Sequence, residues 1–171
     1  MWEKVVENGG RRYTRRSALK ETVAQMFLGQ YQHSVDDKSR LMIPARFREL
    51  LVGGAFITQG FDRCLMVMTG SYFEEVYRRI NSMNLADPTA RMLRRLFLAN
   101  AYPVEIDKVG RILIPANLRE VVSLAGEAIV AGQGEYFEVW TPAQWNEQVT
   151  KLQDTDANNQ RFAALDLSSK T

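Results

Sequence analysis

The sequence predicts an α+β protein in which two similar β-β-α-β-β halves, related by a pseudo-two-fold axis, are joined by a helical connector and followed by a C-terminal helix. The first observation is an internal repeat: the sixteen residues that begin at Asp36 align with those that begin at Asp107, at an offset of 71, and seven are identical. Further identities continue the alignment after one inserted residue: Ile57, Gly60, Val67, Thr69 and Glu75 with Ile129, Gly132, Val139, Thr141 and Glu147. Two copies are too few for a solenoid, which needs about three or more, so each half is expected to bury its apolar face against the other.

In the first half, residues 31–35 and 40–43 are predicted strands around a turn at residues 36–39, where Asp and Ser side chains can bond the local backbone. A short helix is expected to begin at Pro44, whose missing N–H costs nothing at a first helical position. Its buried face has i, i+3, i+4 spacing: Phe47, Leu50 and Leu51. Glycines 53 and 54 end this helix, and strands are predicted at residues 55–59 and 64–68.

Two helices are predicted to connect the halves. Ser71 lies three residues before Glu74 in a capping-box pattern, so it is interpreted as the cap of a helix that runs to about residue 83. The second helix has Asp87 as its cap and Pro88 in its first turn, and runs to about residue 100. The residues expected to face inward are Phe73, Val76, Tyr77 and Ile80, then Met92, Leu93, Leu96 and Phe97. The outer face of the second helix carries Arg91, Arg94 and Arg95.

The second half repeats this order. Strands are predicted at residues 102–106, 111–114, 128–132 and 136–140, with a helix from Pro115 whose inward residues are Leu118, Val121 and Val122. Thr141 and Pro142 open a last helix with Trp145, Val149 and Leu152 on one face. From residue 153 a frayed polar tail is expected, in which the apolar residues are Phe162, Leu165 and Leu167.

The predicted domain plan is therefore an N-terminal extension at 1–25, repeats at 26–70 and 101–144, a helical connector at 71–100, and a C-terminal helix and tail at 145–171. The extension carries six basic and three acidic residues, whereas residues 26–171 carry sixteen and seventeen. Three interpretations of the extension stay open: a disordered arm, a basic arm that attracts phosphate, or a start-site artefact with the true start at Met26.

The composition is that of a globular protein, with 46% hydrophobic and 25% charged residues. No apolar run approaches the roughly 18 residues that span a membrane, and the N-terminus does not match a signal peptide. The single cysteine, Cys64, excludes an internal disulfide and is expected in a buried strand. A cytoplasmic protein is expected. Because residues 26–171 are nearly neutral, an argument for nucleic-acid binding must come from local charge clusters.

The sequence argues against an enzyme, because a nucleophile needs a base and a metal needs several ligands. The one histidine, His33, lies in a predicted strand, and Asp36 and Asp37 are better explained as turn caps than as a catalytic pair. The glycines form neither a P-loop nor a dinucleotide fingerprint. No catalytic residue, metal, cofactor or small-molecule substrate is expected.

Several motifs together resemble the MraZ family of bacterial transcriptional regulators. They are Met26-Phe27-Leu28-Gly29, two Asp-x-x-x-Arg motifs (Asp36 to Arg40 and Asp107 to Arg111), the apolar-apolar-Ile-Pro-Ala run after each, and Phe137-Glu138-Val139-Trp140. The halves are similar to the SpoVT/AbrB module, so the resemblance implies a swapped-hairpin β-barrel assembled from both halves.

The resemblance further implies a sequence-specific DNA-binding regulator. Members of the family act on the division and cell-wall gene cluster, including their own promoter, and assemble into rings that engage successive DNA repeats. Double-stranded DNA and other copies of the chain are therefore the expected partners, and a nucleoid association is expected. The alternative, from another class, is an AbrB-like structural or protein-interaction module without specific DNA binding.

By position, the resemblance implies DNA contact by Arg40 first, with Lys38 beside it and Arg46 as a weaker candidate. Arginine can bond guanine bidentately, whereas lysine serves phosphate as a point charge. The second half has Val109 and Asn117 at the positions of Lys38 and Arg46. We therefore expect the first half to dominate DNA contact.

A structural interpretation of the same arginines stands beside this one. Arg40 and Arg111 could each pair with the aspartate four residues earlier, Asp36 or Asp107, and hold the turn. Arg48 and Arg119, which are identical in the two copies, are expected to be structural.

One turn position departs from the family pattern. Ser39 stands where glycine is usual, as at Gly110. If that position needs a positive φ, serine carries about 1 kcal/mol of strain, which would act on the loop that presents Arg40.

Overall fold

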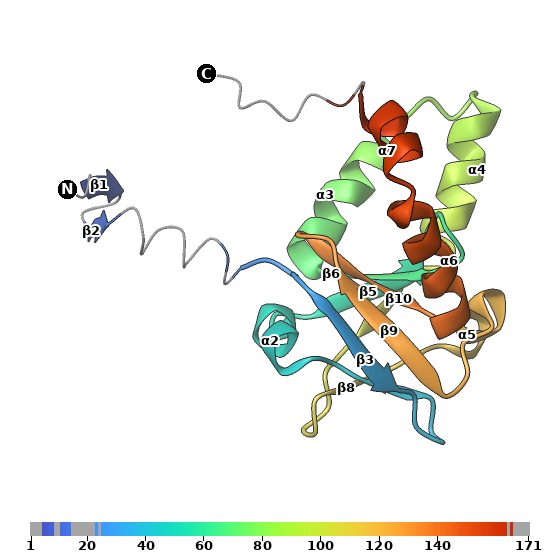
Figure 1. Cartoon of the computed structure of the whole chain (residues 1–171), viewed down its shortest axis with the longest axis horizontal. Helices are drawn as coiled ribbons and strands as arrows, with labels where there is room; N and C mark the ends of the chain where they lie inside the picture. Colours follow the sequence, from blue (N-terminus) through green and yellow to red (C-terminus); the bar gives the residue numbers. More distant parts are fainter. Residues whose placement is uncertain (1–4, 9–10, 15–22, 24, 164, 166–171) are drawn as a thin grey trace.

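The computed structural model describes residues 5–8, 11–14, 23, 25–163 and 165 (Figure 1). Its main sheet has six antiparallel strands in the order β3-β9-β10-β6-β5-β7. Three come from the first half, β3 (Gln30–Ser34), β5 (Ala55–Gln59) and β6 (Leu65–Thr69). Three come from the second half, β7 (Tyr102–Val104), β9 (Glu127–Gly132) and β10 (Tyr136–Trp140). The mixed α+β class is the predicted one.

The first strand of each half pairs with the other half. β3 lies against β9, and β7 lies against β5, while the hairpins β5–β6 and β9–β10 meet through β6 and β10. The equivalent strands of the two halves are β3 and β7, β5 and β9, and β6 and β10. Reading the strand order from either end therefore gives equivalent strands in the same order, as a pseudo-two-fold axis requires. This exchange of strands is the swapped arrangement that the resemblance implied.

A second, two-stranded sheet crosses between the halves. It pairs β4 (Arg40–Met42) with β8 (Arg111–Leu113), with Leu41 opposite Ile112. Both of these central side chains are 0% exposed. The two sheets thus enclose one core between them; their closure into a complete barrel stays a prediction.

The core is built from both halves, as the repeat predicted. Its centre is aromatic: the rings of Phe27 and Phe137 lie 5.2 Å apart and Phe47 lies 5.1 and 5.3 Å from them. Tyr31 adds an edge contact to Phe47 at 5.3 Å. Edge-to-face pairs at such distances add stability beyond their buried area, so this cluster fixes where the helix after the first turn docks.

The short helices after the two turns differ slightly from prediction. The first consists of α2 (Ala45–Arg48) and the 3₁₀ turn η1 (Glu49–Leu51), and the second is α5 (Ala116–Val122). Pro44 and Pro115 are N-caps with extended ψ, one position before the helical start that was predicted for them. Val121 was predicted to face inward and is 46% exposed, because it falls one position outside the buried i, i+4 pair Leu118 and Val122.

Four longer helices cover the sheet end that lies away from the turns: α3 (Gly70–Asn81), α4 (Pro88–Phe97), α6 (Pro142–Gln153) and α7 (Thr155–Phe162) (Figure 1). The predicted cap Ser71 is wrong. Thr69 caps α3 by accepting a hydrogen bond from the backbone N–H of Tyr72, and Ser71 lies inside the helix. Thr69 ends a strand with extended backbone, the conformation that an N-cap needs. Its repeat partner Thr141 caps α6 in the same way.

The second helix of each pair is also capped alike. The cap at Asp87 is confirmed, and Asp154 caps α7. Residues 155–162 were predicted as part of a frayed tail, but this cap supports a helix there. Each half therefore ends in two helices, so the connector and the C-terminal helices occupy equivalent places in the repeat.

In the longer helices, three residues that were predicted to face inward are exposed: Tyr77 at 43%, Met92 at 67% and Leu152 at 56%. The helices instead pack through an aromatic set in which Phe56 and Phe73 stack at 3.9 Å and Phe73 and Phe97 at 6.4 Å. Phe162 and Leu165 are also exposed, while Leu167 lies outside the described residues.

In the N-terminal extension, β1 (Val5–Asn8) pairs antiparallel with β2 (Arg11–Thr14). The sequence predicted a disordered arm or a start-site artefact, and residues 15–22 fall outside the described part of the chain. A role in phosphate attraction stays a prediction. Among the helices that the structure describes, none is long and apolar enough to cross a membrane.

Candidate nucleic-acid interface

The two Asp-x-x-x-Arg turns project from one edge of the molecule. In Figure 1 the turn after β3 and the turn before β8 lie along the lower edge, opposite the four longer helices. In the first turn, Asp36 Oδ1 accepts hydrogen bonds from the backbone N–H groups of Lys38 and Arg40, at 3.0 and 2.9 Å. Its Oδ2 accepts from Arg40 Nε at 2.9 Å. Asp36 thus caps the turn, as the sequence predicted.

The second turn repeats this geometry bond for bond. Asp107 Oδ1 accepts from the backbone N–H groups of Val109 and Arg111, at 2.9 and 3.0 Å, and Oδ2 accepts from Arg111 Nε at 2.9 Å. The repeat in the sequence is therefore a repeat of one hydrogen-bonded loop.

The turns are also bonded to each other. The backbone N–H of Ile43 donates to the carbonyl oxygen of Gly110 at 2.9 Å, and that of Ile114 donates to the carbonyl oxygen of Ser39 at 3.0 Å. These two bonds exchange partners across the pseudo-two-fold axis. They hold the two turns at a fixed separation, which matters for any ligand that touches both.

Ion pairs join the two turns into one network. Each arginine pairs with the aspartate of its own turn, Arg40 with Asp36 at 2.7 Å and Arg111 with Asp107 at 2.8 Å. Arg111 Nη1 also reaches Asp36 at 3.1 Å, while Arg40 Nη1 lies 3.9 Å from Asp107. Each arginine therefore makes the pairing that the structural interpretation expected, and Arg111 also pairs across the axis.

The network lowers the pKa of both carboxyl groups. The side-chain hydrogen bond from Arg111 is the main cause for Asp107, whose pKa falls from 3.8 to about 2. The hydrogen bond from Arg40 lowers the pKa of Asp36 in the same direction. Both groups are ionised at neutral pH, so the two arginines are neutralised locally by the aspartates.

Both turns need a residue with positive φ. Ser39 has a φ of 63° and Gly110 a φ of 94°. The condition for strain at Ser39 is thus met. At Gly110 a Cβ would lie 2.5 Å from the Arg48 guanidinium, so a side chain there would displace that guanidinium as well as strain the backbone.

The structure places the remaining predicted residues as follows. Lys38 is exposed at the tip of the first turn. Arg46 is exposed on α2 and donates to the backbone carbonyl of Val23 at 3.3 Å. Arg48 is structural, since its Nε donates to the Ile43 carbonyl at 2.8 Å. Arg119 has a buried Nε that finds no hydrogen-bond partner among the described residues.

Lys108 is a candidate that the sequence comparison missed. It is exposed at the tip of the second turn, at the repeat position of Asp37 rather than of Lys38. Residues 36–48 hold four cations and two carboxylates, and residues 107–119 hold three and one, so both segments have a net charge of +2. A comparison of the two segments position by position does not show that their net charges are equal, because the lysine is the third residue of the first motif and the second residue of the other.

Other reactive side chains do not join this edge. Cys64 was expected in a strand but lies in the turn just before β6, where burial raises its pKa to about 12. Within the described residues, no cluster of histidine, cysteine, aspartate or glutamate side chains is arranged to hold a metal ion.

The comparisons with known proteins find the same repeat that the two turns show. A family model described as "MraZ protein, putative antitoxin-like" matches the chain twice, over residues 26–96 and 97–167. The chain belongs to the MraZ family. Each MraZ match contains one turn and reaches into the helix pair that follows it, which agrees with the structural repeat.

Similar proteins include one named "Transcriptional regulator MraZ" from Roseiflexus castenholzii, 44% identical over 81% of this chain and 94% of that protein. A protein of the same name from Roseiflexus sp. is 45% identical over the same shares. A third, from Thermomicrobium roseum, is 44% identical over 74% of this chain and 89% of its own. All three relatives carry the name of a transcriptional regulator.

Proposed function

We propose that this protein is a sequence-specific DNA-binding transcriptional regulator and that the edge formed by the two turns is its DNA surface. The observation that carries the proposal is the bonded pair of turns, each with an exposed lysine at its tip and an arginine held beneath it. Two such tips at fixed separation suit a double helix, whose phosphates repeat regularly. The names of the MraZ relatives support the same function.

Within this edge, Arg40 is the first candidate for reading a base. Arginine has five N–H donors, and Arg40 uses its Nε and Nη2 on Asp36. Its Nη1 has only the 3.9 Å approach to Asp107 among the described residues, whereas Arg111 Nη1 bonds Asp36 at 3.1 Å. Arg40 is also the more exposed side chain, at 29% against 21%. It therefore keeps more capacity for a guanine edge.

The target proposed from the resemblance is the division and cell-wall gene cluster, including the protein's own promoter at its head. A ring of copies would present several turn edges to successive DNA repeats. Modest contacts then add through effective concentration, which suits an edge whose arginines are largely neutralised. The corresponding location of the protein is the cytoplasm, in association with the nucleoid.

The alternative function is a protein-interaction module on the same fold. The nearly neutral charge of residues 26–171 favours it, because many DNA-binding domains are strongly basic. The two functions differ in salt dependence, since log K for DNA falls by about 0.9 per phosphate contacted.

The test is a mobility-shift titration with the DNA upstream of the protein's own gene, a scrambled duplex, and two salt concentrations. Arg40→Ala is expected to lower affinity by roughly 5- to 150-fold, the range of one bidentate arginine–base contact, with the oligomer unchanged. Arg78→Ala is the matched control, because Arg78 also pairs with an acidic residue four positions earlier but lies on α3. Equal binding by Arg40→Ala and parent would refute the assignment of Arg40, and no preference over the scrambled duplex would favour the interaction module.

A further inference from the structure

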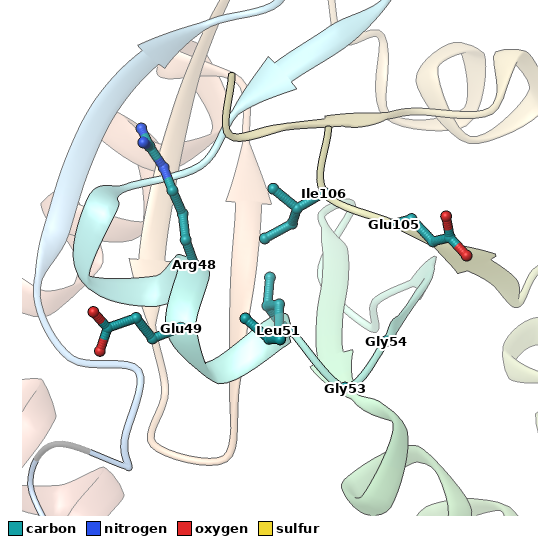
Figure 2. Close-up of a pocket in the computed structure, with 8 residues that line it drawn as sticks. Arg48, Glu49, Leu51, Gly53, Gly54, Glu105 and Ile106 are labelled. Carbon is teal, nitrogen blue, oxygen red and sulfur yellow. The ribbon is translucent and has the colours of Figure 1, made fainter. Parts of the chain in front are cut away.

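A hollow of about 570 Å³ lies at the start of β5. Figure 2 shows Leu51 and Ile106 pointing toward one another across it, with the carboxylates of Glu49 and Glu105 at opposite sides. Val52, which also lines the hollow, is 83% exposed. This site therefore has an apolar floor and an acidic rim.

A projecting aromatic turn lies at the other end of the same strand. Phe61, between β5 and β6, is 64% exposed, and its neighbours Asp62 and Arg63 are also exposed. A large apolar side chain at the tip of a turn gains nothing from water, whereas aromatic and arginine side chains are typical anchors of protein interfaces.

The hollow and the projecting turn are complementary in charge. Arg63 carries the charge opposite to the rim residues Glu49 and Glu105. Asp62 likewise has an opposite charge in Arg48, which lines the hollow. Contacts with opposite charges on both sides suppress wrong partners and set orientation, so the two surfaces fit each other better than either fits a generic apolar partner.

The two surfaces cannot meet within one molecule. They lie at opposite ends of β5, and its five residues span about 17 Å. A second copy of the chain can supply the missing surface. Contact between different patches on identical copies is heterologous, and it generates closed rings or open filaments.

We propose that the Phe61–Arg63 turn of one copy docks in the hollow at Leu51, Val52 and Ile106 of the next. Phe61 fills the apolar floor, and Arg63 pairs with the rim carboxylates. This inference rests on the proposed homo-oligomer and specifies its interface. A turn and a hollow form the anchor of an interface whose full area, about 800 Å² per partner in typical stable complexes, includes the surfaces around them.

The hollow is directly connected to the DNA edge. Ile106 and Glu105 precede Asp107, the cap of the second turn, and Arg48 both lines the hollow and packs over Gly110. A docked neighbour therefore contacts the chain that leads into the second turn. Assembly and DNA contact would act on the same segment.

The experiment measures mass in solution for the full chain by light scattering and sedimentation. Phe61→Asp removes the projection and Val52→Asp disables the hollow; both positions are exposed, so the core is untouched. Met92→Asp is the matched control, since Met92 is 67% exposed on α4. Each of the first two variants alone is expected to be monomeric, while Met92→Asp assembles like the parent.

The decisive arm mixes Phe61→Asp with Val52→Asp. One variant keeps the hollow and the other keeps the projection, so the mixture is expected to give 1:1 dimers that cannot extend. Variants that keep the parent's mass, a mixture that stays monomeric, or a monomeric parent would each overturn the proposed interface. The DNA titration reports separately: a monomeric parent that binds its promoter selectively would leave the regulator standing and remove only the oligomer.

Discussion

The two turns share the hydrogen bonds that each makes within itself, and they differ in the residues at their tips. Asp36 and Asp107 each cap two backbone N–H groups and one arginine at nearly the same distances. The first tip reads Asp37-Lys38-Ser39 and the second Lys108-Val109-Gly110. The comparison teaches that the residues which build the loop are fixed by geometry, whereas the residues that face a partner can diverge.

The largest expected difference between the halves lies beneath the turns. Phe47 and Leu118 are repeat equivalents and both are 0% exposed, but Phe47 also contacts three aromatic rings. Phe47→Ala should lower the free energy of unfolding by about 3–5 kcal/mol, more than Leu118→Ala. Denaturant unfolding of both variants measures this. Equal losses would mean that the aromatic cluster adds nothing beyond burial.

The next effect concerns the second turn alone. Gly110→Ser places a side chain at positive φ, at about 1–2 kcal/mol, and its Cβ displaces the Arg48 guanidinium from the Ile43 carbonyl, at about 1 kcal/mol more. A loss of about 2–3 kcal/mol in unfolding free energy is therefore expected. Arg48→Ala combined with Gly110→Ser is the control, because without the guanidinium the serine should add only its backbone cost.

A smaller effect of opposite sign is expected at the first turn. Ser39→Gly relieves the positive φ but increases the freedom of the unfolded chain, so a net stabilisation of roughly 0.5 kcal/mol should remain. Thermal unfolding of parent and variant measures it. Destabilisation would show that the Ser39 side chain makes a stabilising contact that outweighs its backbone strain.

The smallest effect is a dependence on acid. Because Asp107 has a pKa of about 2 in the folded protein and an ordinary value of 3.8, its pairing stabilises the fold above about pH 4 and is lost as the pH falls toward 2. Asp107→Asn should therefore lose less stability than the parent across that window. Denaturant unfolding at steps between pH 5 and pH 2 tests this, and parallel curves for the two proteins would contradict it.

Much of this fold could be predicted from the sequence because the repeat is direct. Identical Asp, Arg, Ile, Pro and Ala residues at an offset of 71 required two copies of one loop. The bond from Arg111 to Asp36 could not be predicted from spacing, since it joins residues 75 apart. This bond can be inferred only when the pairing of β4 with β8, which brings the two turns together, is known.

Two kinds of sequence prediction were wrong for physical reasons: one helix cap and the burial of some helix residues. Ser71 matched a capping rule, but Thr69 stands where the strand ends with extended backbone and takes that role. The repeat alignment of Thr69 with Thr141, which opens the last helix, already indicated this cap. Met92 and Tyr77 have helical spacing but lie at the margins of their apolar stripes, where spacing alone does not decide burial.

The exchange of strands between the halves has a consequence for synthesis. Residues 26–70 leave the ribosome with β3 lacking its partner, because β9 ends only at residue 132. β6 likewise waits for β10, which ends at residue 140. At about 5–20 residues per second, the first half spends several seconds with open strand edges before the second half arrives. Nascent chains of this protein are thus exposed to wrong strand pairing for that interval, and a neighbouring nascent copy offers the most similar wrong partner.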